Sequence, residues 1–148
     1  MLIGIPSLLG PEFLATLRAM GHGDELAIVD GNYPAEAHGQ RVVRADGHGL
    51  IEIIDAVLTV MPVDDAVPQA LFRAAPVGRP EALDAVHHEM VAVCARHAPG
   101  REVAVLAGQA FYDRVKTAFA VVASGEARLY ANFIVRKGVI LPTERTRP

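Results

Sequence analysis

The sequence predicts an α/β fold: a compact single domain with a central, mainly parallel or mixed sheet flanked by helices. Three observations carry this prediction. Hydrophobic residues make up 51% of the chain, yet there are only five Phe, three Tyr and no Trp, so Ala, Val, Leu and Ile must build a core of the kind a buried sheet provides. Helical and strand patterns are mixed along the chain. The 148 residues show no repeat or linker, so we expect one domain over residues 1–148.

Turn-forming residues divide the first half of the chain. Pro11 suits the first turn of a helix, and Gly21 suits a left-handed C-terminal cap. Gly31 and Pro34 end an apolar run of strand character, and Pro62 follows a second amphipathic segment. The expected elements are a helix over 11–20, a strand over 25–30, a short extended piece at 42–43 within the loop 39–49, and a helix over 50–61.

The second half continues the alternation. Pro80 suits the start of the longest helix, whose inward stripe includes Leu83 and Cys94, and Pro99-Gly100 marks its end. The expected elements are a short strand near 71–72, a helix over 80–97, a strand over 103–106, a helix over 110–116, a strand over 119–123, a turn at 124–126 and an extended segment over 129–136.

Charge and hydropathy exclude several classes of partner. The net charge is −3 with no long basic stretch, so we expect neither nucleic acid nor an anionic membrane as a partner. The apolar runs end well before the roughly 18 residues that a membrane span needs, and the N-terminus lacks the basic region of a signal peptide. The single cysteine, Cys94, excludes an intramolecular disulfide and suits a cytoplasmic location.

The run from Met20 to Pro34 holds the densest chemistry. His22 lies between two glycines at the end of the first helix, and Asp30 lies at the end of the following strand, so the run carries an imidazole and a carboxylate at the ends of adjacent elements. His22 is a candidate acid/base, because a histidine gains and loses a proton near neutral pH. The alternative is a capping role in which the ring binds a free carbonyl at the helix end.

Each nearby acid has a structural alternative. Asp30 follows the carboxyl end of a strand, where open α/β sheets bind their ligands, but an Asp there also forms Asx-turns. Asp24 is expected to bind backbone amides of the loop and to help orient His22.

The segment Tyr130-Ala131-Asn132 is a further candidate. In an extended strand, residues two apart point to the same side, so a phenol and a carboxamide would face one way while Ala131 packs the other. This is a hydroxyl-recognition pair if it borders a pocket, and otherwise part of a half-exposed edge strand.

The other reactive side chains predict no chemistry. The remaining histidines lack metal-ligand spacing, so no metal site is expected. Ser7 and Ser124, the only serines, lack a nucleophile elbow. Cys94 falls on a core stripe, where inert packing is expected.

These residues carry a family resemblance. The chain resembles the D-ribose pyranase / L-fucose mutarotase family, and more closely its fucose branch, through an ordered set of short motifs that spans nearly the whole sequence. The matching segments are Gly21-His22-Gly23-Asp24-Glu25, Asp30-Gly31-Asn32-Tyr33-Pro34, Val43-Arg44-Ala45-Asp46-Gly47, Ala110-Phe111-Tyr112-Asp113-Arg114, Ala118-Phe119-Ala120-Val121-Val122, Gly125-Glu126, Tyr130-Ala131-Asn132 and Lys137-Gly138-Val139.

The resemblance implies a cofactor-free mutarotase that interconverts anomers of a free monosaccharide, L-fucose or a related sugar. It implies that His22 is the proton donor and that Asp30, Tyr130, Ala131 and Asn132 bind the sugar. In the mechanism that we expect, His22 is the acid/base, and Asp30 either anchors sugar hydroxyls or supports the nearby His22 imidazole. The resemblance further implies a compact α/β domain that assembles into a homo-oligomeric ring, typically a decamer, with its sites at subunit boundaries.

One position departs from the family pattern. The family has a basic sugar-binding residue shortly before the Phe-Tyr-Asp-Arg segment, and counting back from Phe111 places it at Gly108. Either Gln109 or another residue covers this role, or the substrate differs, or the activity is weakened. The alternative function is a sugar-binding or regulatory homologue with weak or no turnover.

Overall fold

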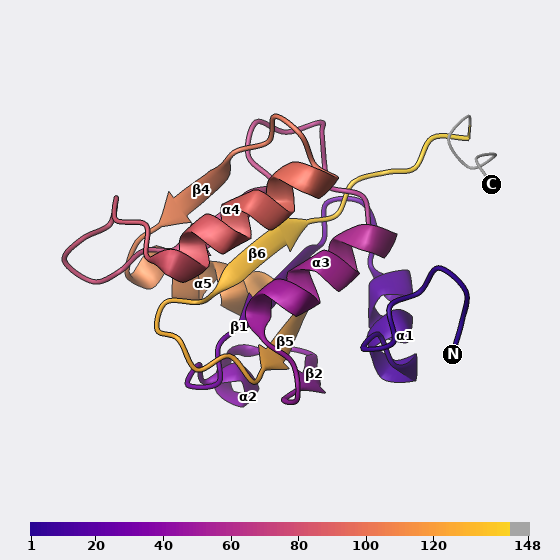
Figure 1. Cartoon of the computed structure of the whole chain (residues 1–148), viewed down its shortest axis with the longest axis horizontal. Helices are drawn as coiled ribbons and strands as arrows, with labels where there is room; N and C mark the ends of the chain where they lie inside the picture. Colours follow the sequence, from indigo (N-terminus) through magenta and orange to yellow (C-terminus); the bar gives the residue numbers. More distant parts are fainter. Residues whose placement is uncertain (143–148) are drawn as a thin grey trace.

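A computed structural model describes residues 1–142, in which helices and strands alternate (Figure 1). Along the chain these elements are α1 (Pro11–Ala19), β1 (Glu25–Val29), α2 (Ala35–His38), β2 (Val42–Ala45), α3 (Leu50–Val60), β3 (Leu71–Ala74), α4 (Ala85–His97), β4 (Val103–Leu106), α5 (Gln109–Thr117), β5 (Ala120–Ser124) and β6 (Phe133–Arg136).

The strands form one mixed sheet in the order β2-β5-β1-β6-β3-β4. Five strands run in the same direction, and β6 alone is antiparallel to its neighbours β1 and β3. The carboxyl ends of the five parallel strands and the amino end of β6 therefore lie at one edge of the sheet, here called the carboxyl edge. The opposite edge is here called the amino edge. The expected α/β class with a mainly parallel or mixed sheet is confirmed.

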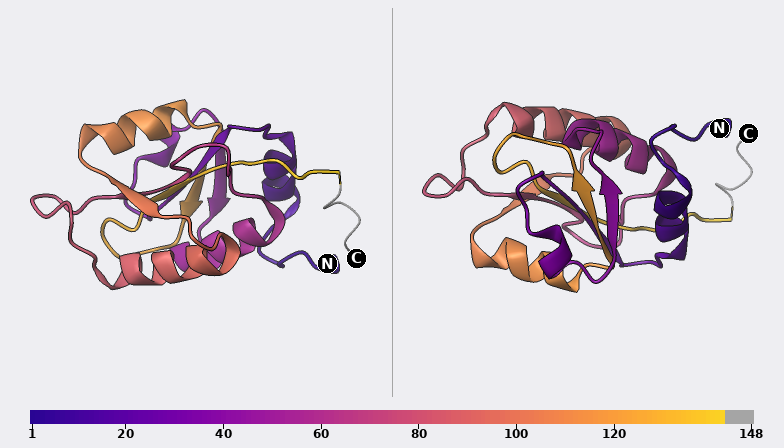
Figure 2. Two further views of the ribbon diagram at one scale, coloured as in Figure 1. Left: turned by 90° about the horizontal axis from the view of Figure 1, so that it is seen from above. Right: turned by 90° about the horizontal axis from the view of Figure 1, so that it is seen from below.

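Helices cover both faces of the sheet (Figure 2). One hydrophobic cluster joins α1, α3 and α4 to inward residues of the sheet such as Ile28 and Phe133. The other joins α2 and α5 to alternate residues such as Val29 and Ile134. Because strand side chains alternate between faces, β1 is buried at all five positions. None of the helices over residues 1–142 is long and apolar enough to cross a membrane.

Several expected boundaries are wrong. The longest helix begins at Ala85, not at Pro80, because Asp84 accepts from the N3 backbone as the N-cap residue, and Leu83 consequently points outward with 43% of its surface exposed. The α1 helix ends with an extended Met20 rather than a left-handed Gly21. The short helix α2 was not expected. Cys94 is buried in the core, as its place on the stripe predicted.

Candidate functional site

At the carboxyl edge, Asp30 and Asn132 form a reciprocal pair (Figure 1 shows β1 beside β6). The Asp30 N–H donates to Asn132 Oδ1 at 2.9 Å, and Asn132 Nδ2 donates to Asp30 Oδ2 at 2.9 Å. The other carboxylate oxygen, Oδ1, accepts from the N–H of Asn32 at 2.9 Å, so the expected Asx-turn is also present. Asp30 and Asn132 are 6% and 7% exposed. Nearly buried groups with fixed partners are rigid, so they would lose little conformational freedom if a ligand bound to them.

The 130–132 segment is not the regular strand that the sequence predicted. β6 begins only at Phe133, and Tyr130 has a φ of +58°, which places it in the left-handed region. The strict alternation of a strand therefore does not apply to Tyr130 and Asn132. Ala131 is fully buried, as expected, but both its neighbours border the same small cavity.

This cavity has a volume of about 90 Å³. It is lined by Tyr33, Ala74, Ala75, Val77, Leu106, Gly108, Phe111, Tyr112, Tyr130 and Asn132. On the other side of Tyr33 lies a more open hollow of about 390 Å³ that Asp30 and Ser124 border. The carboxyl edge thus offers adjoining spaces with Asp30 and Asn132 between them.

Aromatic side chains form one wall of these spaces. The rings of Tyr33 and Tyr112 stack with centroids 5.5 Å apart, and the Tyr33 hydroxyl lies 2.9 Å from His38 Nδ1. Burial raises the pKa of Tyr33 well above its usual value, and the neighbouring Tyr112 and Asp30 raise it further. Tyr33 is therefore a neutral hydrogen-bonding group at physiological pH.

Gly108 occupies the edge of the cavity and has a φ of +52°. A Cβ there would meet no atom within 4 Å, so space is available, but the left-handed backbone favours glycine. Gln109 does not line either hollow at this edge, and its amide donates to Asp113 at 2.8 Å, one turn along α5. The expectation that Gln109 substitutes at this position is not supported by its geometry.

His22 lies at the amino edge, in the loop between α1 and β1. Its side chain is 48% exposed, and its Nε2 lies 3.2 Å from Oδ1 of Asp64, which is 1% exposed. Asp64 also accepts from Arg136 Nε at 2.8 Å and from the N–H of Ala66 at 3.0 Å. Burial raises the pKa of the Asp64 carboxyl, but the hydrogen bonds from Arg136, Ala66 and His22 outweigh burial and hold the pKa below its usual value.

Asp64, which is separated from His22 by 42 positions, was not predicted from the sequence. The only feature of the sequence that pointed to Asp64 was its position, shortly after Pro62 ends the second expected helix. Asp24 does accept a backbone hydrogen bond, from the N–H of Gly21 at 2.7 Å. Gly23, next to His22, has a φ of +85°, and a Cβ there would lie 2.8 Å from Arg136 Nη2. Glycine suits this position because of its left-handed backbone, and its missing side chain leaves room for the Arg136 guanidinium.

The sequence-based idea that Asp30 supports the His22 imidazole within one chain is wrong. His22 precedes β1 and Asp30 follows it, so the two residues lie at opposite edges of the sheet. The five residues of β1 alone extend about 16 Å at a rise of about 3.3 Å per residue. Position in the sequence placed these groups close together, but an extended strand separates its own ends.

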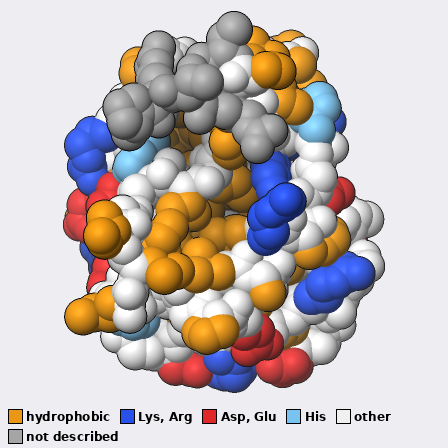
Figure 3. Space-filling model, turned by 90° about the vertical axis from the view of Figure 1, so that its right-hand side faces the viewer, with side chains coloured by type: hydrophobic (Ala, Val, Ile, Leu, Met, Phe, Trp, Pro, Cys, Tyr) orange, Lys and Arg blue, Asp and Glu red, His pale blue; other side chains and the backbone are white. Residues whose placement is uncertain are grey.

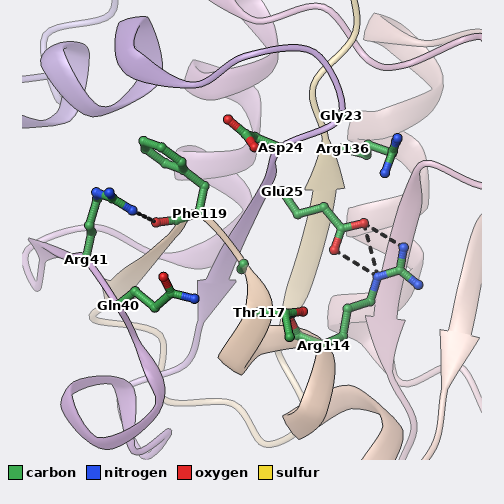
Figure 4. A pocket seen from close by; sticks show the side chains of 10 residues that line it. Gly23, Asp24, Glu25, Gln40, Arg41, Arg114, Thr117, Phe119 and Arg136 are labelled. Carbon is green, nitrogen blue, oxygen red and sulfur yellow. Dashed lines mark hydrogen bonds and ion pairs between the residues drawn. The ribbon is translucent and has the colours of Figure 1, made fainter.

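A hollow of about 570 Å³ at the amino edge is bordered by Gly23 and Asp24, which follow His22 in the sequence (Figure 4). Its arginine side chains bind other groups of the same chain. Arg114 forms a forked ion pair with Glu25, with an Nη2–Oε1 distance of 2.6 Å, and its guanidinium stacks on the Phe72 ring. Arg41 donates to the Phe119 carbonyl at 3.1 Å. Over residues 1–142 no group of three or more His, Cys, Asp or Glu side chains is placed to hold a metal ion.

An open sheet with polar side chains at its carboxyl edge is the arrangement in which α/β proteins bind small ligands. A model of the RbsD / FucU transport protein family matches residues 3–140, and the chain belongs to this family, as its motifs predicted.

Curated relatives and solved structures agree with this assignment. The chain is 41% identical to a fucose mutarotase of Homo sapiens, with 93% of each chain covered, and 38% identical to an L-fucose mutarotase of Actinobacillus pleuropneumoniae, with 94% of this chain and 97% of the relative covered. The crystal structure of the fucose mutarotase from Streptococcus pneumoniae in complex with L-fucose superposes with a TM-score of 0.87 at 34% identity, covering 95% of this chain and 100% of the other. RbsD of Bacillus subtilis, complexed with D-ribose, shares the fold with a TM-score of 0.68 at 21% identity, covering 90% and 95%.

Proposed function

We propose that this protein is a cofactor-free mutarotase that interconverts the anomers of a free monosaccharide, L-fucose or a related sugar. The relatives named fucose mutarotase match more than nine-tenths of the chain, and one of the similar structures is a complex with L-fucose. The structural observation that carries the proposal is the buried, reciprocal Asp30–Asn132 pair beside adjoining hollows at the carboxyl edge.

The carboxyl edge binds the sugar in this proposal. Asp30 accepts hydrogen bonds from sugar hydroxyls, and Asn132 and Tyr130 contact ring substituents, with buried Ala131 as the support beneath them. A carboxylate and a carboxamide together offer acceptors and donors, which is what a ring of hydroxyl groups requires. Because the two groups are already held by each other, the sugar meets a preorganised pair.

His22 is the proposed acid/base. The anomeric hydroxyl gives up its proton while the ring oxygen gains one, the bond from C1 to the ring oxygen breaks, and C1 becomes a carbonyl. Rotation about C1–C2 and closure with the reverse proton transfers yield the other anomer. Because His22 Nε2 faces Asp64, Nδ1 is the nitrogen left for the sugar, and the Asp64 carboxylate stabilises the imidazolium that forms. Asp24 supports this loop through Gly21.

Since His22 and Asp30 lie at opposite edges, the proposal requires two copies of the chain for each site. The His22 loop of one copy would complete the Asp30 edge of another, as expected for a ring such as a decamer with sites at subunit boundaries. Exposed apolar residues support self-association: Leu2, Ile3, Leu129, Val139 and Ile140 are all at least half exposed. The end of the molecule that carries α1 shows hydrophobic side chains gathered around a hollow (Figure 3).

The first experiment measures exchange at the anomeric proton by saturation-transfer NMR over a panel that includes fucose and ribose. Enhanced exchange of L-fucose that His22→Ala abolishes is the expected result. Absence of enhanced exchange with every sugar, in protein that is folded, would contradict the proposed activity. The buried Cys94 and a free-sugar substrate fit a cytoplasmic location, which stays a prediction.

A mixing experiment tests the shared site. His22→Ala and Asp30→Ala are each expected to be inactive, but a refolded equimolar mixture regains about a quarter of the wild-type activity, because about one interface in four then combines an intact His22 with an intact Asp30 from different copies. A mixture as inactive as its components would show that each site uses residues of a single chain.

A second candidate is a sugar-binding homologue without turnover, which Gly108 favours because it offers no side chain to the cavity. It predicts saturable binding of L-fucose with no acceleration of anomer exchange. The same NMR series distinguishes it, because line broadening reports binding even where saturation transfer reports no exchange.

A further inference from the structure

His87 is a fully buried histidine whose two ring nitrogens both have hydrogen-bond partners. In the first turn of α4, its Nδ1 accepts from the backbone N–H of Asp84 at 3.0 Å. Its Nε2 lies 3.1 Å from the carbonyl oxygen of Tyr130, 43 positions along the chain. Because an amide N–H only donates and a carbonyl oxygen only accepts, these contacts assign a neutral ring with its proton on Nε2.

Tyr130, the residue that His87 binds, has a strained backbone. Over residues 1–142 it is the one residue other than glycine with a positive φ, at +58°. A tyrosine adopts this left-handed conformation only where its surroundings enforce it, because its Cβ crowds the adjacent carbonyl oxygen. The hydrogen bond from a buried, immobile imidazole is such a constraint.

Tyr130 lies two residues before Asn132, which belongs to the proposed binding pair. Ala131 is completely buried, and the Asn132 carbonyl accepts from the N–H of Ala74 at 3.1 Å, so the segment is anchored on its far side by β3. The Asn132 amide then reaches Asp30 on β1. With β3 on one side and α4 on the other, the turn at Tyr130 determines where the Asn132 side chain points.

We infer that His87 is a positioning residue of the proposed sugar site: its hydrogen bond to the Tyr130 carbonyl holds residues 130–132 in the conformation that directs Asn132 to Asp30. That the positioned residues bind a sugar rests on the proposed function. The connection from His87 through Tyr130 to Asn132 rests on geometry alone. His87 touches neither hollow at the carboxyl edge and acts only through the backbone of Tyr130.

The charges around His87 favour the neutral ring that this role needs. Burial lowers the pKa of His87, and the positive charge of Arg73 on β3 and the neighbouring His88 lower it further. The hydrogen bond to Tyr130 and the charge of Asp84 act in the opposite direction without reversing the shift. Near pH 7 the ring is therefore neutral, with Nδ1 free to accept and Nε2–H free to donate.

An apolar residue of similar size could fill the same space, but it would leave the Asp84 N–H and the Tyr130 carbonyl without these partners. Unsatisfied buried backbone groups are destabilising, so the loss would act first on the segment that is already strained. His88 provides a matched control, because it is the next residue on the same helix and is exposed.

The test compares full-length His87→Leu and His87→Gln with His88→Gln. We expect His87→Leu to speed amide hydrogen exchange over residues 128–133 roughly tenfold, with exchange in β1 and β5 unchanged. In the sugar assay, the half-saturating L-fucose concentration is expected to rise about five- to tenfold while the rate at saturation stays within about twofold. Because glutamine keeps an N–H that can donate to the Tyr130 carbonyl, His87→Gln should fall between wild type and His87→Leu, and His88→Gln should match wild type.

Unchanged amide exchange over 128–133 in His87→Leu, or an increase of the same size throughout the chain, would overturn the inference, because His87 would then be an ordinary core residue. If His87→Leu does not fold, His87→Gln is judged by the same two outcomes. If the wild type neither binds nor converts L-fucose, the proposed function fails, and amide exchange alone decides the role of His87.

Discussion

The two edges of the sheet place their polar residues in opposite ways. At the amino edge the candidate acid/base, His22, is half exposed, and the charge behind it, Asp64, is buried. At the carboxyl edge the candidate binding residues Asp30 and Asn132 are themselves nearly buried and hold each other. The difference suits the proposed roles. In the proposed site, a proton-transferring group of one subunit reaches a sugar bound to another, whereas binding groups gain from being rigid before the sugar arrives.

The largest effect is expected from the exposed group of the amino edge. His22→Ala removes the acid/base, so the rate enhancement of L-fucose anomer exchange should fall about 10²- to 10⁴-fold. Anomeric-proton saturation transfer measures it, and His88→Ala, an exposed histidine on α4, serves as the control. Activity that survives His22→Ala would show that His22 at the amino edge is not the acid/base.

The next effect comes from the buried charge behind His22. Asp64→Asn leaves the Arg136 guanidinium without its carboxylate, and we expect the free energy of unfolding in urea to fall by about 2–3 kcal/mol, less than for a fully buried pair because Arg136 is 32% exposed. Anomer exchange should also slow, since the His22 imidazolium loses its counter-charge. Asp65→Asn is the control, because Asp65 is the exposed residue next to Asp64. A stable Asp64→Asn protein with full activity would show that Asp64 neither holds the fold nor orients His22.

A pH titration of stability probes the carboxyl edge. Hydrogen bonds from Arg128 lower the pKa of Glu126 from 4.5 to about 2 despite partial burial. A depressed carboxyl pKa stabilises the fold above the unfolded-state pKa, and this contribution is lost as pH falls from about 4.5 towards 2. We expect the free energy of unfolding to drop over that window by about 2 kcal/mol more in wild type than in Glu126→Gln. Glu36→Gln, at an exposed position, should titrate like wild type. Identical titrations of wild type and Glu126→Gln would be the contrary result.

The smallest effect is expected from the binding pair itself. Asn132→Leu removes both hydrogen bonds to Asp30 and leaves its N–H and carboxylate short of partners, so L-fucose should bind about tenfold more weakly, equivalent to about 1.4 kcal/mol. Isothermal titration calorimetry measures the affinity. Asn32→Ala, which keeps its backbone N–H to Asp30, is the matched control. Equal affinities in the two variants would leave the reciprocal pair without a role in binding.

Local patterns predicted much of this molecule. The apolar run over Glu25–Val29, the amphipathic stripe of α3 and the cap-and-breaker signals around them are short-range features, so the sequence alone determined most elements, the α/β class and the family. The start of α4 was misplaced because a proline and a real N-cap compete within a few residues, and only the cap at Asp84 was satisfied.

The site depended on contacts that sequence patterns do not contain. His22 meets Asp64 across 42 positions, Asn132 meets Asp30 across 102, and His87 meets Tyr130 across 43. Sequence proximity suggested that His22 and Asp30 face each other, but an extended β1 holds them at opposite edges. The sequence identified most of the candidate residues, because residue type and spacing are local properties. Only the tertiary structure decided which of them meet, because the order and direction of the strands set those distances.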